Sequence, residues 1–428
     1  MTSTVRKTTL DNGVRVVTES IEYVQSVSVG IWVATGARYE DPAHRGISHF
    51  LEHMLFKGTE RRPSAKHIAD EMDSVGGYLN AFTDKEYTCY YARALSENLP
   101  LVIDILSDMY SNSVFDPEET ARERKVVLEE IKRRDDDPDD LVHDLFAQTL
   151  YPNHPLGLPV IGTAEVVASL EPDDLRAYMR QHYGPGAVIV AAAGNLEHEQ
   201  GVDLVREHLG GLQGVGEAKV DVPPAAAIDT LNYVRPIAQM NFCVGVPAFG
   251  QFDAEKYPLA ILDTVLGGSM GSRLFQEIRE KRGLAYSVGT YAAIHREGGY
   301  FVAYGGTSPE SYNECLDLVR QEFAKVREHG ITADEMERAK AQYRSGIVMK
   351  QESMSSRMNR MGASEVIFDR VIPLDEILAA VDAVTQDDVL RVAQAILPED
   401  LSRVTIAAVG PFKKPRRAPR PKNGAPAA

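Results

Sequence analysis

The chain carries one order of predicted elements twice, and this repetition limits the folds it can adopt. In the first half, strands at 14–17 and 26–35 precede helices at 46–56 and 64–74, a strand pair at 78–82 and 87–94, and helices at 97–111 and 116–134. In the second half, a strand at 239–247 precedes helices at 254–266 and 271–281, a strand pair at 286–293 and 299–304, and helices from about 309 and from 332. Matching Phe115-Asp116-Pro117-Glu118-Glu119 with Ile331-Thr332-Ala333-Asp334-Glu335 sets an offset of 216 residues. Two α/β repeats of this kind indicate a duplication.

The length also predicts two domains, because 428 residues are too many for one ordinary core. We expect an N-terminal repeat at 1–211, a linker at 212–227 rich in Gly, Ala and Pro, and a C-terminal repeat at 228–412. The last segment, 413–428, is basic and rich in Pro, and is predicted to be a disordered tail.

Composition excludes several classes of protein. A hydrophobic content of 44% and a charged content of 25% are those of a soluble globular protein, and no apolar run is long enough to span a bilayer. The net charge of −16 disfavours nucleic acid as a partner. Three distant cysteines indicate a reducing compartment. With no secretory signal or presequence visible, the bacterial cytoplasm is a simpler location than the mitochondrial matrix.

The most informative motif is His49-Phe50-Leu51-Glu52-His53. Residues three and four apart share a helix face, so both imidazoles can hold one divalent metal while Glu52 reaches a water molecule beside it. H-x-x-E-H is the inverted form of a zinc-protease signature. The motif occurs once, and the second repeat lacks it.

A catalytic zinc ion needs a third protein ligand, and the best candidates lie on the helix at 116–134. Glu123 and Glu130 are two turns apart and share a face, close to the side that Val126, Val127 and Ile131 are expected to bury. The plainer interpretation is a solvated charged helix. At the offset of 216, the matching residues of the second repeat are Ala339 and Gly346, so a metal is expected in the first repeat alone.

The segment from Gly46 to Thr59, which contains the motif and ends in Lys57-Gly58-Thr59, resembles the inverzincin metallopeptidases: pitrilysin, insulin-degrading enzyme and the mitochondrial processing peptidase. The resemblance implies one Zn²⁺ per chain. That family's third ligand follows the second histidine after about 76 residues, which here falls on Glu130. Glu123 matches the glutamate that orients a metal-bound histidine, and Glu52 matches the general base.

Further positions carry over from the same resemblance. Asn80-Ala81-Phe82-Thr83 matches the edge strand on which the substrate peptide is laid, and Asn80, Ala81 and Phe82 are the expected substrate-binding residues. Arg279 and Tyr286 match a pair that binds substrate backbone and helps to stabilise the oxyanion, although ordinary packing and a surface ion pair would also explain them. Asp140 and Asp144 match an acidic pair that holds a substrate arginine; an acidic helix N-terminus is the simpler alternative.

With its single pair of repeats, the chain is most similar to the β-subunit of the processing peptidase and its bacterial homologues. This implies an α+β fold in which two homologous repeats, each a mainly antiparallel sheet packed against helices, form half of a clam-shell chamber. The implied function is a zinc-dependent endopeptidase acting on unfolded or presequence-like peptides, with a basic-residue preference as an open point. A homodimer is expected, or a heterodimer with an inactive homologue. Whether Arg279 and Tyr286 act in cis or in trans stays open. The alternative is a catalytically silent scaffold subunit.

Overall fold

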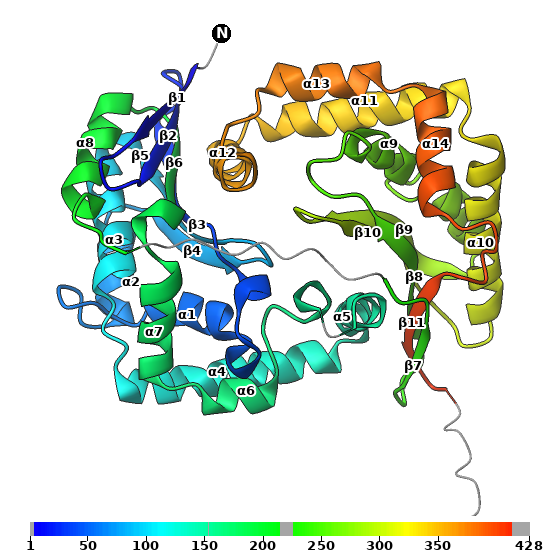
Figure 1. The fold of residues 1–428 in the computed structure, drawn as a ribbon, viewed down its shortest axis with the longest axis horizontal. Coiled ribbons are helices and arrows are strands. Elements are labelled where there is room, and N and C mark those ends of the chain that lie inside the picture. The colour runs from blue at the N-terminus through cyan, green and yellow to red at the C-terminus, as the bar shows by residue number, and fades with distance from the viewer. Residues whose placement is uncertain (1–3, 153, 215–225, 413–428) are drawn as a thin grey trace, which may run out of the picture.

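The computed structural model describes residues 4–152, 154–214 and 226–412, which form two mixed β-sheets, one in each half of the chain (Figure 1). The first sheet has the order β1-β2-β6-β3-β5-β4, and the second has the order β7-β11-β8-β10-β9. All neighbouring strands pair antiparallel except β2 with β6 and β7 with β11. The strands are β1 (Thr4–Thr9), β2 (Arg15–Ser20), β3 (Ser26–Val33), β4 (Tyr78–Thr83), β5 (Thr88–Leu95), β6 (Val188–Gly194), β7 (Thr230–Val234), β8 (Met240–Ala248), β9 (Ala285–Ile294), β10 (Gly299–Thr307) and β11 (Thr405–Gly410).

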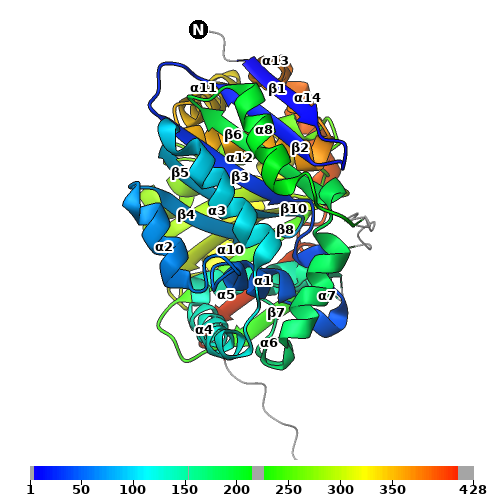
Figure 2. The same ribbon diagram turned by 90° about the vertical axis from the view of Figure 1, so that its left-hand side faces the viewer.

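Helices cover both sheets, so the expected fold class is confirmed. Helices α3 and α8 pack together on the outer face of the first sheet (Figure 2). The first half contains α1 (Ile47–Leu55), α2 (Ala65–Ser74), α3 (Leu99–Asn112), α4 (Pro117–Asp136), α5 (Pro138–Leu150), α6 (Ala164–Ser169), α7 (Pro172–His182) and α8 (His198–Leu209). The second half contains α9 (Lys256–Leu266), the π-helix η6 (Phe275–Glu280), α10 (Tyr312–His329), α11 (Ala333–Lys350), α12 (Met354–Phe368), α13 (Leu374–Ala383) and α14 (Gln386–Ile396).

Helix starts follow local capping chemistry. The Ser64 side chain caps α2, and Thr332 forms a capping box at the start of α11. Ser96, the expected cap of the helix at 97–111, instead begins the 3-10 turn η3 (Ser96–Asn98), and that expectation was wrong. Helix α3 begins after this turn, with Pro100 in its first turn, where a proline costs no hydrogen bond.

The predicted linker at 212–227 lies for its larger part in 215–225, outside the described residues, and the predicted tail at 413–428 lies wholly outside them. Among the described helices, none combines the length and the apolar character that a bilayer crossing demands.

Each half lends one helix to the sheet of the other (Figure 1). Helix α5 packs on β8 and β11 and buries Phe146 beside Cys243. Helix α12 packs on β3 and β6 and buries Met358 beside Trp32, whose indole N–H lies 3.3 Å from the Met358 sulfur. The offset of 216 residues carries α5 onto α12, so the exchanged helices are equivalent elements of the two repeats.

Buried charges anchor α12 in the first half. Glu365 is fully buried and forms ion pairs with Lys7 and, at 3.3 Å, with Arg15. On β2, Glu19 is 2% exposed and pairs with Arg357 of α12. Because a buried charge without a partner is costly, these pairs fix where α12 sits on the first sheet.

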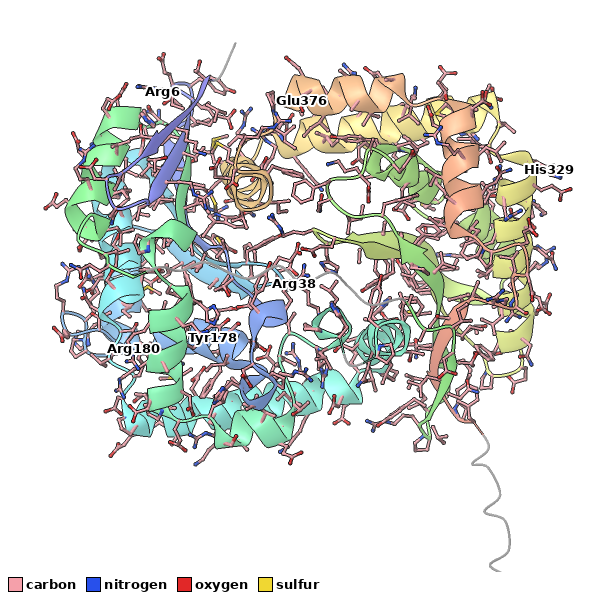
Figure 3. The ribbon with its side chains drawn as sticks, in the orientation of Figure 1. Arg6, Arg38, Tyr178, Arg180, His329 and Glu376 are labelled. Carbon is pink, nitrogen blue, oxygen red and sulfur yellow. The ribbon has the colours of Figure 1, made fainter. Side chains whose placement is uncertain are left out.

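The turns of two equivalent hairpins, β4–β5 and β9–β10, meet between the halves. Arg38, which Figure 3 labels at this junction, is buried and forms an ion pair with Glu86 of the first turn. The same guanidinium lies 2.7 Å from a carboxylate oxygen of Glu297 in the second turn. The backbone N–H of Arg296 donates to Glu86 at 3.0 Å. One arginine therefore ties both halves together.

Candidate metal centre

Helix α1 packs its apolar side into the first core and leaves the polar residues of the motif facing α4 and β4. Its first turn is held by the buried carboxylate of Glu40, which accepts hydrogen bonds from the backbone N–H groups of Gly46 at 2.7 Å and Ser48 at 2.8 Å. Burial raises the pKa of Glu40 to about 7. The buried residues of α1 are Ile47, Ser48, Phe50, Leu51, Met54 and Leu55.

Three donor atoms converge between α1 and α4. The Nε2 atoms of His49 and His53 lie 3.8 Å and 3.6 Å from the same Glu130 carboxylate oxygen. Donor atoms of the three residues lie within 4.8 Å of one another, and no other such group of His, Cys, Asp or Glu occurs in the part of the chain that the structure describes. Ligands of a tetrahedral zinc ion are about 3.4 Å apart when each is about 2.1 Å from the metal. Two imidazoles and a carboxylate on this scale fit a zinc ion.

The two imidazoles are prepared in different ways. Burial, aided by the charge of His53, lowers the pKa of His49 to about 4, which leaves this ring neutral and its lone pair free for a metal. Its Nδ1 atom is buried without a hydrogen-bond partner among the described residues. The Nδ1 atom of His53, by contrast, lies 2.8 Å from an oxygen of Glu123.

Glu123 is the one charged residue of helix α4 that is buried, with 7% of its surface exposed. Its second oxygen lies 2.6 Å from the Lys57 ammonium. Although burial opposes ionisation, the hydrogen bonds from His53 and Lys57 lower the pKa of Glu123. The contact between Glu123 and a metal-side histidine is the arrangement that such sites use to fix the ring tautomer.

The neighbouring residues of α4 correct one expectation. Val126 was expected on the buried side, but it is 51% exposed, whereas Val127 and Ile131 are buried. The buried face of α4 is narrower than the valine pair indicates, because the helix lies at the periphery and packs mainly against α1, α5 and α6. Glu130 lies at the margin of this face and stays partly exposed.

Glu52 lies beside the three donors. Burial raises the pKa of Glu52. The charge of His53 acts to lower this pKa, and the charge of Glu130 acts to raise it. One carboxylate oxygen accepts a hydrogen bond of 2.6 Å from the Thr83 hydroxyl, at the end of β4. Thr83 was expected as the last residue of the substrate edge strand, but its hydrogen bond to Glu52 was not predicted. The period of two along the strand, which places Thr83 on the face of Ala81, indicates only which face of the sheet its side chain occupies.

The predicted substrate residues Asn80, Ala81 and Phe82 lie on β4, which forms an open edge of the first sheet. The Asn80 side chain accepts a hydrogen bond of 2.8 Å from the Ala81 backbone N–H. The Phe82 ring turns to the opposite face and packs edge-on against Trp32, with ring centroids 5.5 Å apart.

The remaining predicted residues lie farther along the chain. On α5, Asp140 is exposed and Asp144 lies 3.0 Å from the Arg134 guanidinium. In the second half, Arg279 donates to the Tyr286 carbonyl at 2.8 Å and stacks on the Tyr286 ring, which is 81% exposed. Among the described residues, no hydrogen bond, ion pair or ring contact joins Arg279 or Tyr286 to the donors on α1 and α4.

Comparisons with known proteins agree with this geometry. Residues 15–164 match the family described as "Insulinase (Peptidase family M16)", and residues 169–343 match "Peptidase M16 inactive domain". An uncharacterized zinc protease of Streptomyces coelicolor is 43% identical over 420 residues, which cover 96% of this chain and 90% of the relative. The chain belongs to the insulinase (M16) peptidase family. The expected membership of the inverzincin peptidases is thereby confirmed.

Other members of the family extend the comparison. An uncharacterized zinc protease of Bacillus subtilis is 40% identical and covers 90% of this chain and 94% of its own. Two solved structures share the fold at low identity. A protease from Helicobacter pylori has a TM-score of 0.87 at 21% identity and covers 95% of this chain and all of its own. A structure described as a peptidase M16 inactive domain, from Pseudomonas fluorescens, has a TM-score of 0.89 at 20% identity over 96% of this chain and 98% of its own.

Proposed function

We propose that this M16 protein is a zinc-dependent endopeptidase that hydrolyses unfolded or presequence-like peptides. The observation that carries the proposal is the convergence of His49, His53 and Glu130 within 4.8 Å, in the half of the chain that matches the insulinase family. These residues would hold one Zn²⁺ per chain, and the zinc protease names of the relatives support this metal.

A bound zinc ion would supply Lewis acidity and lower the pKa of a water molecule at the site. Glu52 is the general base in this proposal: its carboxylate takes the proton of the attacking water and then donates it to the leaving amine. The raised pKa of Glu52 suits both steps, because the carboxyl can hold the proton between them. Glu123 keeps His53 in the tautomer whose Nε2 faces Glu130.

The edge strand β4 is the proposed binding surface for the peptide, which would add a strand beside Asn80, Ala81 and Phe82. Backbone pairing accepts many sequences and requires an extended chain. Asp140 and Asp144 would supply a basic-residue preference, with a substrate arginine competing with Arg134 for Asp144.

Arg279 and Tyr286 would bind substrate backbone and stabilise the oxyanion. Because they sit in the second half, away from the donors, we propose a homodimer in which the first half of one chain faces the second half of its partner across a closed chamber. A heterodimer with an inactive homologue is the second arrangement. The reported relatives are bacterial, which supports a bacterial over a mitochondrial source.

Replacement of the base tests the proposal. Glu52→Gln should retain zinc at one ion per chain and lose turnover of a quenched basic peptide by about 100-fold or more. Wild-type turnover in this variant would remove Glu52 from the proposed role. The scaffold alternative predicts that the wild-type protein, loaded with zinc and checked by metal analysis, cleaves no peptide at all.

A further inference from the structure

Thr83 lies both on the open edge of the first sheet and beside Glu52 of α1. It is the last residue of β4, the open edge of the first sheet, and its side chain lies on the sheet face that α1 covers. Its hydroxyl donates to Glu52 at 2.6 Å, and no other hydrogen bond to the Glu52 side chain occurs in the described part of the chain.

The backbone of Thr83 points toward the open edge. In an antiparallel pair, residues that bond to the neighbouring strand alternate with residues that bond away from it. The Asp84 N–H donates to the Tyr87 carbonyl at 2.8 Å, so Thr83 and Ala81 direct their backbone groups outward. The Ala81 N–H agrees with this alternation, because it donates its hydrogen bond to the Asn80 side chain and not to a neighbouring strand.

A peptide that pairs with β4 would therefore meet the backbone of the residue whose side chain holds Glu52. The packing around Thr83 restricts movement of its backbone relative to its side chain. Its strand partner Thr88 is fully buried, and its Cys89 neighbour is buried with Trp32 in the contact with α12. A shift of the strand end on pairing would be carried to the Thr83 hydroxyl.

We propose that Thr83 is a positioning residue that couples binding of the substrate strand along β4 to the orientation of the Glu52 carboxylate. This inference rests on the proposed peptidase function and deepens it. Without the hydroxyl, Glu52 can rotate away from the attacking water even when the peptide is bound. The loss should then appear in kcat and leave KM and the zinc content unchanged.

Two substitutions separate the hydroxyl from the shape of the side chain. Thr83→Val keeps the β-branched form that suits a strand and removes the donor, whereas Thr83→Ser keeps the donor. Thr9→Val, at the end of β1 on the opposite edge of the same sheet, is the matched control. The probes are a quenched peptide of about 12 residues, ~40 Å when extended, and a truncated form too short to lie along β4.

With the long peptide, Thr83→Val should lower kcat by about 10-fold, the effect of one hydrogen bond to a charged group, while KM changes by less than about twofold. Thr83→Ser should stay within about threefold of the wild type, because it retains the donor. Zinc content and Tm should match the wild type in both variants. The coupling predicts a higher kcat for the long peptide than for the short one in the wild type, and this difference should disappear in Thr83→Val. Thr9→Val should change neither value.

A wild-type kcat in Thr83→Val, an equal loss in Thr83→Ser, an effect on KM alone, or an unchanged ratio between long and short peptides would each overturn the inference. If the zinc-loaded wild type cleaves neither peptide, the proposed function itself fails. If the wild type cleaves and Thr83→Val is unimpaired, the inference fails alone.

Discussion

The Nδ1 atom of His53 lies 2.8 Å from a carboxylate oxygen of Glu123, seven residues before Glu130 on the same helix. The hydrogen bond turns the Nε2 atom of His53 toward Glu130. Glu123 is itself neutralised by Lys57. Lys57 and Glu123 together thus orient the Nε2 atom of His53 toward Glu130.

This relationship predicts the effect of Glu123→Gln on metal affinity. The amide can still accept a hydrogen bond but cannot support the ring electrostatically, so zinc affinity should fall by about 10- to 100-fold. Competition against a chelator measures the change, and activity should recover at excess zinc. Glu129→Gln, an exposed neighbour on α4, is the control. Equal affinities in the two variants would contradict the assignment.

Two helical glycines should respond to alanine with opposite signs. A Cβ atom at Gly362 of α12 would lie 2.2 Å from the Trp32 ring, so Gly362→Ala should cost about 1–3 kcal/mol of unfolding free energy. At Gly346 of α11 a Cβ atom meets nothing within 4 Å, and Gly346→Ala should stabilise the protein by ~0.5–1 kcal/mol. Urea denaturation measures both. A stabilised Gly362→Ala would show that α12 is not packed against Trp32 as described. A destabilised Gly346→Ala would contradict the open space beside Gly346 on α11.

Replacing Arg38, which lies between the two hairpin turns, should strongly destabilise the protein. Arg38→Leu leaves the carboxylates of Glu86 and Glu297 without their shared cation, and we expect a loss of about 3–5 kcal/mol in the free energy of unfolding. Arg122→Leu, which breaks exposed ion pairs on α4, should cost less than ~1 kcal/mol. Similar losses from the two substitutions, compared by denaturant titration, would argue against a buried network.

The pKa of His49 predicts how the metal-free protein responds to acid. Burial lowers this pKa to about 4 from an ordinary value of 6.5. Between pH 6.5 and about pH 4 the His49 side chain is therefore protonated in the unfolded chain but neutral in the folded one. The free energy of unfolding decreases as the pH falls through this range, and His49 causes no further decrease below about pH 4. The contribution is at most ~3 kcal/mol. Chelator-treated His49→Gln should show a flatter pH dependence in urea denaturation at pH 7 and pH 5; an unchanged slope would refute this.

Local periodicity predicted the parts of the fold that depend on neighbours in sequence. Helix geometry alone places His49, Glu52 and His53 on one face of a helix, and it also places Glu123 and Glu130 two turns apart on another. The starts of the helices near residues 64 and 332 were also predicted. The π-helical winding of η6 within the helix expected at 271–281 was missed, because an apolar period does not distinguish the two windings.

Packing partners were beyond the reach of periodicity. The amphipathic patterns of α5 and α12 show that each helix has an apolar side but not which sheet it covers, so their exchange was not foreseen. The partner of Glu52 was missed for the same reason: Thr83 is distant in sequence, and only the fold brings the two together. Val126 shows the opposite failure, since an apolar residue on a peripheral helix can remain exposed.

Because α5 packs on the second sheet and α12 packs on the first, neither half of the chain has a complete core without the other. Each sheet is roofed by a helix encoded in the other half, so the halves are interlocked by more than the peptide connection between residues 214 and 226. A chain nicked in that connection would stay assembled as a non-covalent pair. Two fragments synthesised apart would each lack a roof and would complete their cores only by finding one another.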